Sequence, residues 1–274
     1  MKTELIFIGT SGAIQVPSFH CNCSTCKEAR SNPKLKRTRA SIIISGEEKI
    51  LIDATPDIEH QLERENIHDI DRVFLTHWHY DHCFGLAAFP ELLSHGTWKK
   101  KKMDLYLPQQ DLGYFERDFA WMKPRFILHP LVPGDIIDLP GVKMEIIKTT
   151  HTLDSIGYII SAASKKFAYL GDGIIPPEDT VIKLKNNNLD FIIMEATLDE
   201  LILPKGVKWQ NFSLKESISF WQSLNIAKCF LTHLSCHSWN IDKLIAGIKS
   251  YERKNLEIEY PGLTFAYDGL KIIL

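Results

Sequence analysis

The sequence lacks the segments that a membrane or secreted protein would need. No apolar run reaches the roughly 18 residues of a membrane-spanning helix. The first residues, 1–7, begin a strand at once and contain no apolar core of a secretion signal. The net charge of -2 gives no general attraction to nucleic acids or membranes. We therefore expect a cytoplasmic protein with no membrane partner and no extended nucleic-acid substrate.

The chain also lacks linkers, low-complexity tracts and clear internal repeats. Hydrophobic residues make up 45% of its 274 residues, enough to bury a sizeable core. We predict a single domain over residues 1–274, a size that one large sheet-containing domain can reach. A homodimer is the expected assembly, because two-fold homo-oligomers are the commonest kind.

Histidine is concentrated in one short stretch, Thr76–His82, with the sequence THWHYDH. The apolar run before it predicts a short buried strand. His77 and His79 alternate by two, so on an extended backbone they share a side. Asp81 and His82 lie beyond the turn and can face a second point nearby. So many nitrogen and oxygen donors suit two divalent ions better than one, and the stretch predicts a dinuclear metal site.

Later donors stand just past the ends of other apolar segments that predict strands. They are His151 after 142–146, Asp172 after 167–170 and His233 after 229–232. Asp53 likewise ends the predicted hairpin 41–52. Rigid sheets position side chains at strand ends, and the loops there leave access for a ligand. We therefore expect these residues to lie close to the histidine-rich stretch.

Three of the six cysteines, Cys21, Cys23 and Cys26, crowd together near the N-terminus. Without a secretion signal, this spacing favours metal ligands over disulfide bonds. A redox role is disfavoured, because three thiols with a later fourth donor suit a closed metal site. Cys83 and Cys229 have apolar neighbours and are predicted to be core thiols.

The pattern His-x-His-x-Asp-His at 77–82, with later strand-end His, Asp and His, resembles the metallo-β-lactamase superfamily. The cysteine triplet, together with GTSG at 9–12 and Val16-Pro17, is similar to the PhnP-type phosphodiesterases associated with phosphonate breakdown. This resemblance covers most of the chain. It implies an α/β (α+β) fold, the αββα sandwich, in which two mixed β-sheets are flanked by helices.

The resemblance also implies a set of active-site residues. The first ion would take His77, His79 and His151, the second would take Asp81, His82 and His233, and Asp172 would bridge both. Asp53 matches the family's aspartate that orients a ligand or the bridging water. The catalytic residues implied are thus Asp81, Asp172 and Asp53. Imidazole and carboxylate ligands accept either Mn²⁺ or Zn²⁺, so the two ions could be either.

The cysteine triplet, in a loop at about residues 20–27, would hold one structural Zn²⁺. Family members usually place the fourth ligand, a histidine, three residues after the last active-site histidine. Here that position is Cys236, and His237 follows it. We favour Cys236, which gives a four-thiolate site, with His237 as the alternative. Either residue completes tetrahedral zinc geometry.

The implied function is hydrolysis of a small or cyclic anionic phosphodiester by a hydroxide that bridges the two ions. One departure matters: the family's general-acid histidine is missing, because no histidine lies between Ala196 and Thr232. Phe212 or a near neighbour fills its place. General-acid help is worth roughly 10²–10⁴-fold, so we expect good leaving groups or strained cyclic phosphates as substrates. Trp209 and Phe212 either stack on a base or sugar or anchor their loop.

Two other hypotheses stay open. The first is a different hydrolase of the superfamily, such as a lactonase, thioesterase or tRNA-processing nuclease. The second is a non-catalytic carrier similar to the PqqB proteins of coenzyme biosynthesis, which share the cysteine-rich entry. The complete metal motif favours an enzyme. Four successive lysines at 99–102 indicate a solvated loop or, alternatively, local steering of an anionic substrate.

Overall fold

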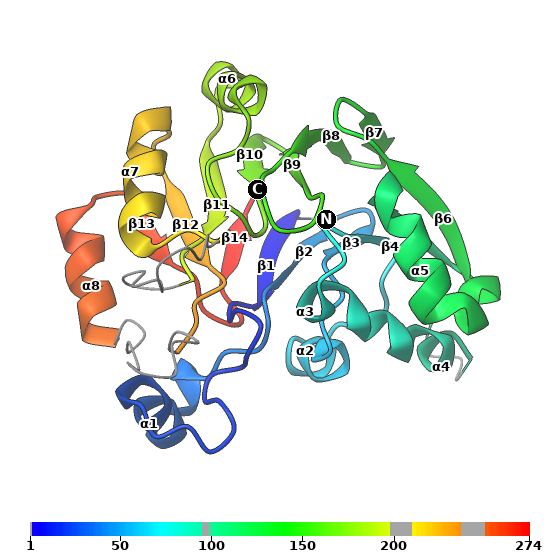
Figure 1. Ribbon diagram of the computed structural model, residues 1–274, viewed down its shortest axis with the longest axis horizontal. Helices are drawn as coiled ribbons and strands as arrows, with labels where there is room; N and C mark the ends of the chain where they lie inside the picture. Colours follow the sequence, from blue (N-terminus) through cyan, green and yellow to red (C-terminus); the bar gives the residue numbers. More distant parts are fainter. Residues whose placement is uncertain (1, 95–97, 99, 198–209, 237–249) are drawn as a thin grey trace.

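Two seven-stranded β-sheets organise the computed structural model, which describes residues 2–94, 98, 100–197, 210–236 and 250–274 (Figure 1). The first sheet has the order β14 (Lys271–Ile273), β1 (Glu4–Gly9), β2 (Ser41–Ser45), β3 (Lys49–Ile52), β4 (Arg72–Phe74), β5 (Met103–Pro108) and β6 (Phe126–Leu131). The second has the order β13 (Leu263–Phe265), β12 (Cys229–Thr232), β11 (Phe191–Glu195), β10 (Lys165–Tyr169), β9 (Ile156–Ala162), β8 (Val142–Lys148) and β7 (Ile136–Leu139).

Both sheets are mixed in the same way. In the first, the antiparallel pairs run from β14 to β3 and the parallel pairs from β3 to β6. In the second, the antiparallel pairs run from β7 to β10 and the parallel pairs from β10 to β13. The predicted hairpin at 41–52 is present as β2 and β3, in register from Ile42 opposite Ile52 to Ser45 opposite Lys49.

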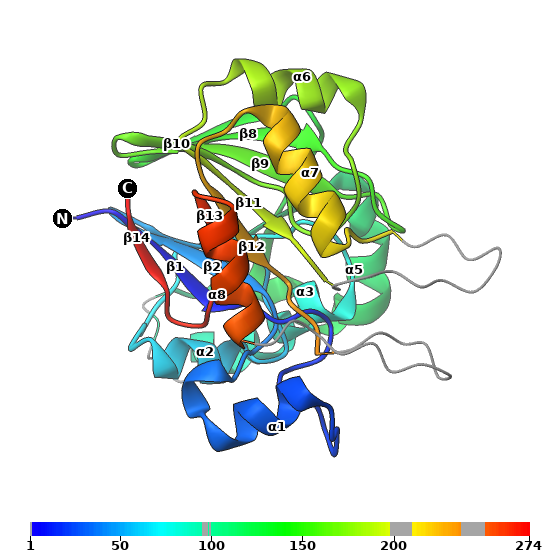
Figure 2. The same cartoon turned by 90° about the vertical axis from the view of Figure 1, so that its left-hand side faces the viewer.

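Helices cover the outer faces of both sheets, giving four layers. Helices α2 (Ile58–Arg64), α3 (Tyr80–Cys83), α4 (Phe89–Ser94) and α5 (Leu112–Phe119) pack on the first sheet, and α6 (Glu178–Asn186), α7 (Leu214–Leu224) and α8 (Ser250–Glu259) on the second. In Figure 1, α7 and α8 lie on one side of the strands and α4 and α5 on the other, and Figure 2 looks at the molecule from the side of α7 and α8. Helix α1 (Ser24–Ser31) lies apart, beside the cysteine-rich loop. The predicted αββα sandwich is confirmed.

The alternation of apolar residues along the strands explains the layers. In β1, Leu5 and Phe7 enter the core between the sheets, whereas Ile6 and Ile8 enter the core under α2 and its neighbours. Successive residues of a strand point to opposite faces, so a strand buried on both sides must be continuously apolar. Each such side chain contributes roughly 1.5–3 kcal/mol on burial. The cores thereby hold the strand ends in fixed positions.

No helix in the described part of the chain is long and apolar enough to cross a membrane.

Asp111, just before α5, is a buried carboxyl group for which the described residues provide no hydrogen bond. It is fully buried, and among the described residues neither of its carboxylate oxygens makes a hydrogen bond. Burial, and next the negative charge of Asp154, raise the pKa of Asp111 from 3.8 to about 7. Folding therefore favours the protonated form of this side chain.

We expect Asp111→Asn to stabilise the protein more at high pH than at low pH. Because the pKa of Asp111 is raised on folding, wild-type stability falls as the pH rises from about 4 to about 7 and is then constant. The gap in unfolding free energy between variant and wild type should widen by about 1–3 kcal/mol between about pH 5 and about pH 8. Urea unfolding at both pH values measures it. A gap that is independent of pH would contradict the prediction.

Candidate metal centres

Seven predicted donors converge where the strand ends of both sheets meet, and they form two sets. Within each set, one donor atom from every residue lies within 4.8 Å of the others. The first set comprises His77, His79 and His151; the second comprises Asp81, His82, Asp172 and His233. The two sets come from the turn after β4, from α3 and from the loops after β8, β10 and β12. The predicted gathering at strand ends is therefore present.

In the first set, three imidazole rings turn one nitrogen each toward a common point. The Nδ1 atom of His79 lies 3.0 Å from Nε2 of His77 and 3.0 Å from Nε2 of His151. The outer nitrogen of His151 donates a hydrogen bond to the Gln210 carbonyl, 2.9 Å away, so its Nε2 is left with a lone pair. Burial lowers the pKa of all three histidines, which favours neutral rings. Converging lone pairs of this kind fit a metal cation.

The second set is almost fully buried and strongly charged. The Oδ2 atom of Asp172 lies 3.0 Å from Nε2 of His233 and 3.2 Å from Nε2 of His82. Burial opposes charge on both acids, but the two histidines hold the pKa values of Asp81 and Asp172 well below the usual range. Against burial, the carboxylates raise the pKa of His233 to about 10 and that of His82 well above its usual value.

The carboxylates of Asp81 and Asp172 therefore stabilise positive charge in this pocket. Nε2 of His82 is buried and makes no hydrogen bond among the described residues, although it faces Asp81 and Asp172. A divalent cation would replace the protons on the two rings and use the same atoms. Two carboxylates and two imidazoles are a suitable ligand set for Mn²⁺ or Zn²⁺. In this arrangement Asp172 belongs to the second set, and its bridging to the first stays a prediction.

Asp53 acts behind the second set. Its Oδ2 lies 2.9 Å from Nδ1 of His82, and its Oδ1 accepts hydrogen bonds from the backbone N–H and the hydroxyl of Thr76, at 2.8 and 3.0 Å. Asp53 is fully buried. By accepting a hydrogen bond from Nδ1–H, it leaves Nε2, which faces Asp172, as the nitrogen available to a metal ion. This placement suits an aspartate that orients a ligand, one of the two roles predicted for it.

We expect Asp53→Asn to weaken metal binding at the second set by roughly 10–100-fold, the usual cost of losing a partner of a metal ligand. The amide lacks the negative charge that fixes the ring of His82. A calorimetric titration with Mn²⁺ would measure the effect. Asp190→Asn is the control, because Asp190 pairs with Lys165 on the surface, away from the donors. Equal affinity in wild type and Asp53→Asn would contradict the prediction.

Glu195, at the end of β11, supports His233, and our sequence reasoning did not find it. It is buried, accepts hydrogen bonds from the side chain of Asn211 and from the backbone N–H of Gly173, and its Oε2 lies 3.7 Å from Nδ1 of His233. Burial, and next the charge of Asp172, raise the pKa of Glu195 to about 8. The available signal was a charged residue that ends an apolar strand, the same pattern as at the other sites.

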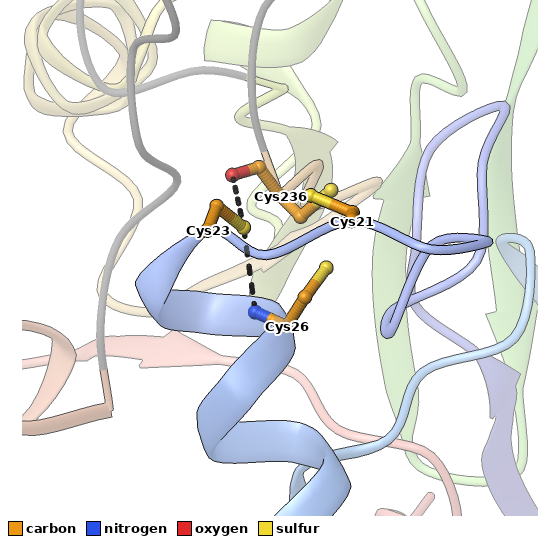
Figure 3. A group of neighbouring side chains, drawn as sticks. All are labelled: Cys21, Cys23, Cys26 and Cys236. Carbon is orange, nitrogen blue, oxygen red and sulfur yellow. Dashed lines mark hydrogen bonds between the residues drawn. The ribbon is translucent and has the colours of Figure 1, made fainter.

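The four predicted cysteine ligands form a third cluster, shown in Figure 3. Cys21, Cys23 and Cys26 come from the N-terminal loop and α1, and Cys236 comes from the loop after β12. One sulfur from each lies within 4.8 Å of the others, and none forms a disulfide. The backbone N–H groups of Ser18 and Cys26 donate to the sulfurs of Cys26 and Cys23, at 3.2 and 3.4 Å. Four converging sulfurs fit a tetrahedral zinc ion.

Some sequence predictions fall outside this geometry. Trp209, His237 and Lys99 lie outside the described residues. Phe212 is buried and stacks on Phe220, with ring centroids 5.5 Å apart. Of the two roles predicted for Phe212, this packing supports the anchoring of its loop. Cys83 and Cys229 are fully buried in the cores, as predicted.

A family model described as the metallo-beta-lactamase superfamily matches residues 36–213. Among curated proteins, the coenzyme PQQ synthesis protein B of Ectopseudomonas mendocina is 32% identical over 99% of this chain and 100% of that protein. A ribonuclease Z of Archaeoglobus fulgidus is 20% identical over 86% of this chain and 88% of its own length. An octanoyltransferase of Porphyromonas gingivalis is 25% identical over 98% of this chain, which spans only 51% of that relative.

Two solved structures are similar over almost the whole chain. The first is a diphosphatase from the PhnP family, with a TM-score of 0.81 and 25% identity, covering 100% of this chain and 98% of the other. The second is Zn²⁺-bound PqqB from Methylobacterium extorquens, with a TM-score of 0.77 and 20% identity, covering 99% of this chain and 100% of the other.

Proposed function

This chain belongs to the metallo-β-lactamase superfamily, and we propose that it is a hydrolase, specifically a phosphodiesterase acting on small or cyclic phosphodiesters. The observation that carries the proposal is the pairing of two complete donor sets at one edge of the sandwich. Similarity to a PhnP-family diphosphatase supports phosphoryl chemistry in particular. We assign the first set to one divalent ion and the second set to another.

Two divalent ions in such a site supply an acidified water and polarise the phosphoryl oxygens. The chain's own residues prepare the site for them. Thr76 and Asp53 hold His77 and His82 with their lone pairs inward. Asp81 and Asp172 contribute two negative charges, fewer than the positive charges of two ions. A pocket with residual positive charge favours an anionic substrate over a neutral one.

We propose that no residue in the described part of the chain protonates the leaving group. The sequence analysis placed Phe212 or a near neighbour at the position of the missing histidine. Phe212 is buried, and its side chain has no proton to give. Glu195 lies behind His233 and forms hydrogen bonds with Asn211 and Gly173. We therefore propose that substrates with good leaving groups or strained cyclic phosphates are cleaved fastest.

The test is an assay of bis(p-nitrophenyl) phosphate beside a 2′,3′-cyclic nucleotide, with Mn²⁺ or Zn²⁺ added, for wild type and Asp81→Ala. Turnover of both compounds by wild type alone would establish a phosphodiesterase that does without the missing histidine. Turnover of the activated ester alone would mean that the missing acid limits natural phosphodiesters. Absence of turnover in metal-loaded protein would overturn the proposal.

A non-catalytic carrier is the second candidate, because the protein that is 32% identical over its full length is a coenzyme PQQ synthesis protein B. The complete donor sets argue against it, since a carrier needs no pair of ions. Tight binding of a small anion without turnover, in metal-loaded protein, would favour the carrier.

A further inference from the structure

Arg37 is a buried cation for which the described residues provide no partner. Only 3% of its surface is exposed. Its Nε atom is buried and makes no hydrogen bond, and the described residues contain no ion pair with its guanidinium group. A buried charge without a partner costs several kcal/mol, so proteins rarely retain one without a counter-charge. Arg37 therefore needs a negative charge that the side chains in the described part of the chain do not supply.

Nearby charged side chains do not meet this need. Asp268 forms its ion pair with Arg64, at 3.0 Å, and also accepts hydrogen bonds from Thr10 and Thr38. Arg253, on α8, is a second cation near Arg37. Burial, and next the charge of Arg253, lower the pKa of Arg37 to about 9, whereas Asp268 and two cysteines act in the opposite direction.

The backbone directs Arg37 toward the cysteine cluster. Val16 and Arg37 are antiparallel partners, and each backbone N–H donates to the other's carbonyl, at 2.9 and 2.7 Å. Directly opposite residues of an antiparallel pair place their side chains on the same face. On that face, Val16 packs against Cys26 and Cys236. Arg37 consequently lies within electrostatic reach of two of the four sulfurs.

We propose that Arg37 is the counter-charge of the four-cysteine metal site. The inference rests on the assignment of Cys21, Cys23, Cys26 and Cys236 to a structural zinc. A zinc ion with four thiolates carries a net charge of about -2, and a site with one histidine in place of a cysteine carries about -1. This extra buried negative charge requires a cation close by. Arg37 supplies it from its isolated backbone bridge to Val16, which packs in the cysteine cluster.

The experiment is anaerobic titration of the reduced full-length protein with Co²⁺, followed through the thiolate-to-cobalt charge-transfer absorption. This signal reports the cysteine site alone, because the other two donor sets contain no thiolate. Arg37→Met removes the charge and keeps much of the apolar volume, and Arg37→Lys keeps the charge. We expect Co²⁺ to bind Arg37→Met about 10–100-fold more weakly than wild type and Arg37→Lys to recover most of the loss.

Lys36→Met is the matched control, since it removes a positive charge from the adjacent, exposed residue. Its affinity should stay within about two-fold of wild type. Wild-type affinity in Arg37→Met, or an equal loss in Lys36→Met, would overturn the proposal. If wild type itself shows no charge-transfer absorption, the structural-metal assignment fails instead.

A double-mutant comparison separates charge from packing, and it also serves if Arg37→Met folds poorly. Cys236→His lowers the negative charge of the site by one. In that background, the loss caused by replacing Arg37 with Met or Gln should shrink to about a third or less of its value with Cys236. An equal loss in both backgrounds would show that Arg37 acts through packing and would overturn the proposal.

Discussion

Asp172→Ala should reduce metal-dependent phosphodiester turnover by roughly 10³-fold or more. The Asp172 carboxylate lies 3.0 and 3.2 Å from the inward nitrogens of His233 and His82, and it is 5% exposed. Its removal leaves the second set with a single carboxylate, so that a second divalent ion would lose both a ligand and half of the compensating charge. Initial rates with bis(p-nitrophenyl) phosphate, together with the metal content of the purified protein, measure the effect.

Asp69→Ala is the control for this experiment. Asp69 is half-exposed and pairs with Lys49 at the surface. Because Asp69 belongs to neither donor set, its loss should change turnover by less than about two-fold. If the Asp172→Ala variant keeps both its second metal ion and its turnover, the assignment of the second set is refuted. Loss of turnover with full metal content would place Asp172 in the reaction without making it necessary for metal binding.

Cys26→Ser should remove the structural metal and lower the unfolding free energy by several kcal/mol, a large part of the roughly 5–15 kcal/mol of a typical domain. Cys26 is fully buried, and its sulfur is 3.2 Å from the backbone nitrogen of Ser18. A metal ion bound there would join the N-terminal loop to the loop that follows β12 and carries His233. The binding free energy is therefore part of the folding free energy. Zinc content and urea unfolding measure the two effects.

Cys229→Ser provides the matched comparison, because Cys229 is equally buried and packs among apolar side chains. Burial of a hydroxyl group there costs about 1–3 kcal/mol and leaves the metal content unchanged. A chelator that removes the zinc should make wild type as unstable as Cys26→Ser, while Cys26→Ser itself should not respond. If Cys26→Ser keeps its zinc and its stability, the four-cysteine site is not structural.

Both variants test residues that the sequence identified, and the reason is chemical. Histidine, aspartate and cysteine are the side chains that bind transition metals, and here they follow apolar segments that must form strands. The alternation of His77 and His79, and the strand ends before His151, Asp172 and His233, already place the donors on one edge of a sheet. The fold class followed from the same pattern through the family resemblance, and the two mixed sheets confirm it.

Apart from Asp53, the supporting residues could not be identified from the sequence, because their roles depend on contacts across long sequence separations. Glu195 is only one of several residues that end an apolar strand. Its approach to His233 in the folded protein is what gives it a role. Arg37 stands in a basic stretch that resembles any solvated segment. Only the folded chain pairs it with Val16, which packs in one cluster with Cys26 and Cys236.

The sequence by itself determined the metal-binding chemistry of this protein, since the identity and local spacing of donors depend on covalent structure alone. It also predicted the layered fold, through the resemblance that the spacing of those donors carries. Tertiary structure alone decided which ring nitrogen of each histidine faces inward, that Glu195 lies behind His233 and that Arg37 is buried. These features depend on hydrogen bonds and charges between distant segments, and such contacts exist only after the two sheets have packed together.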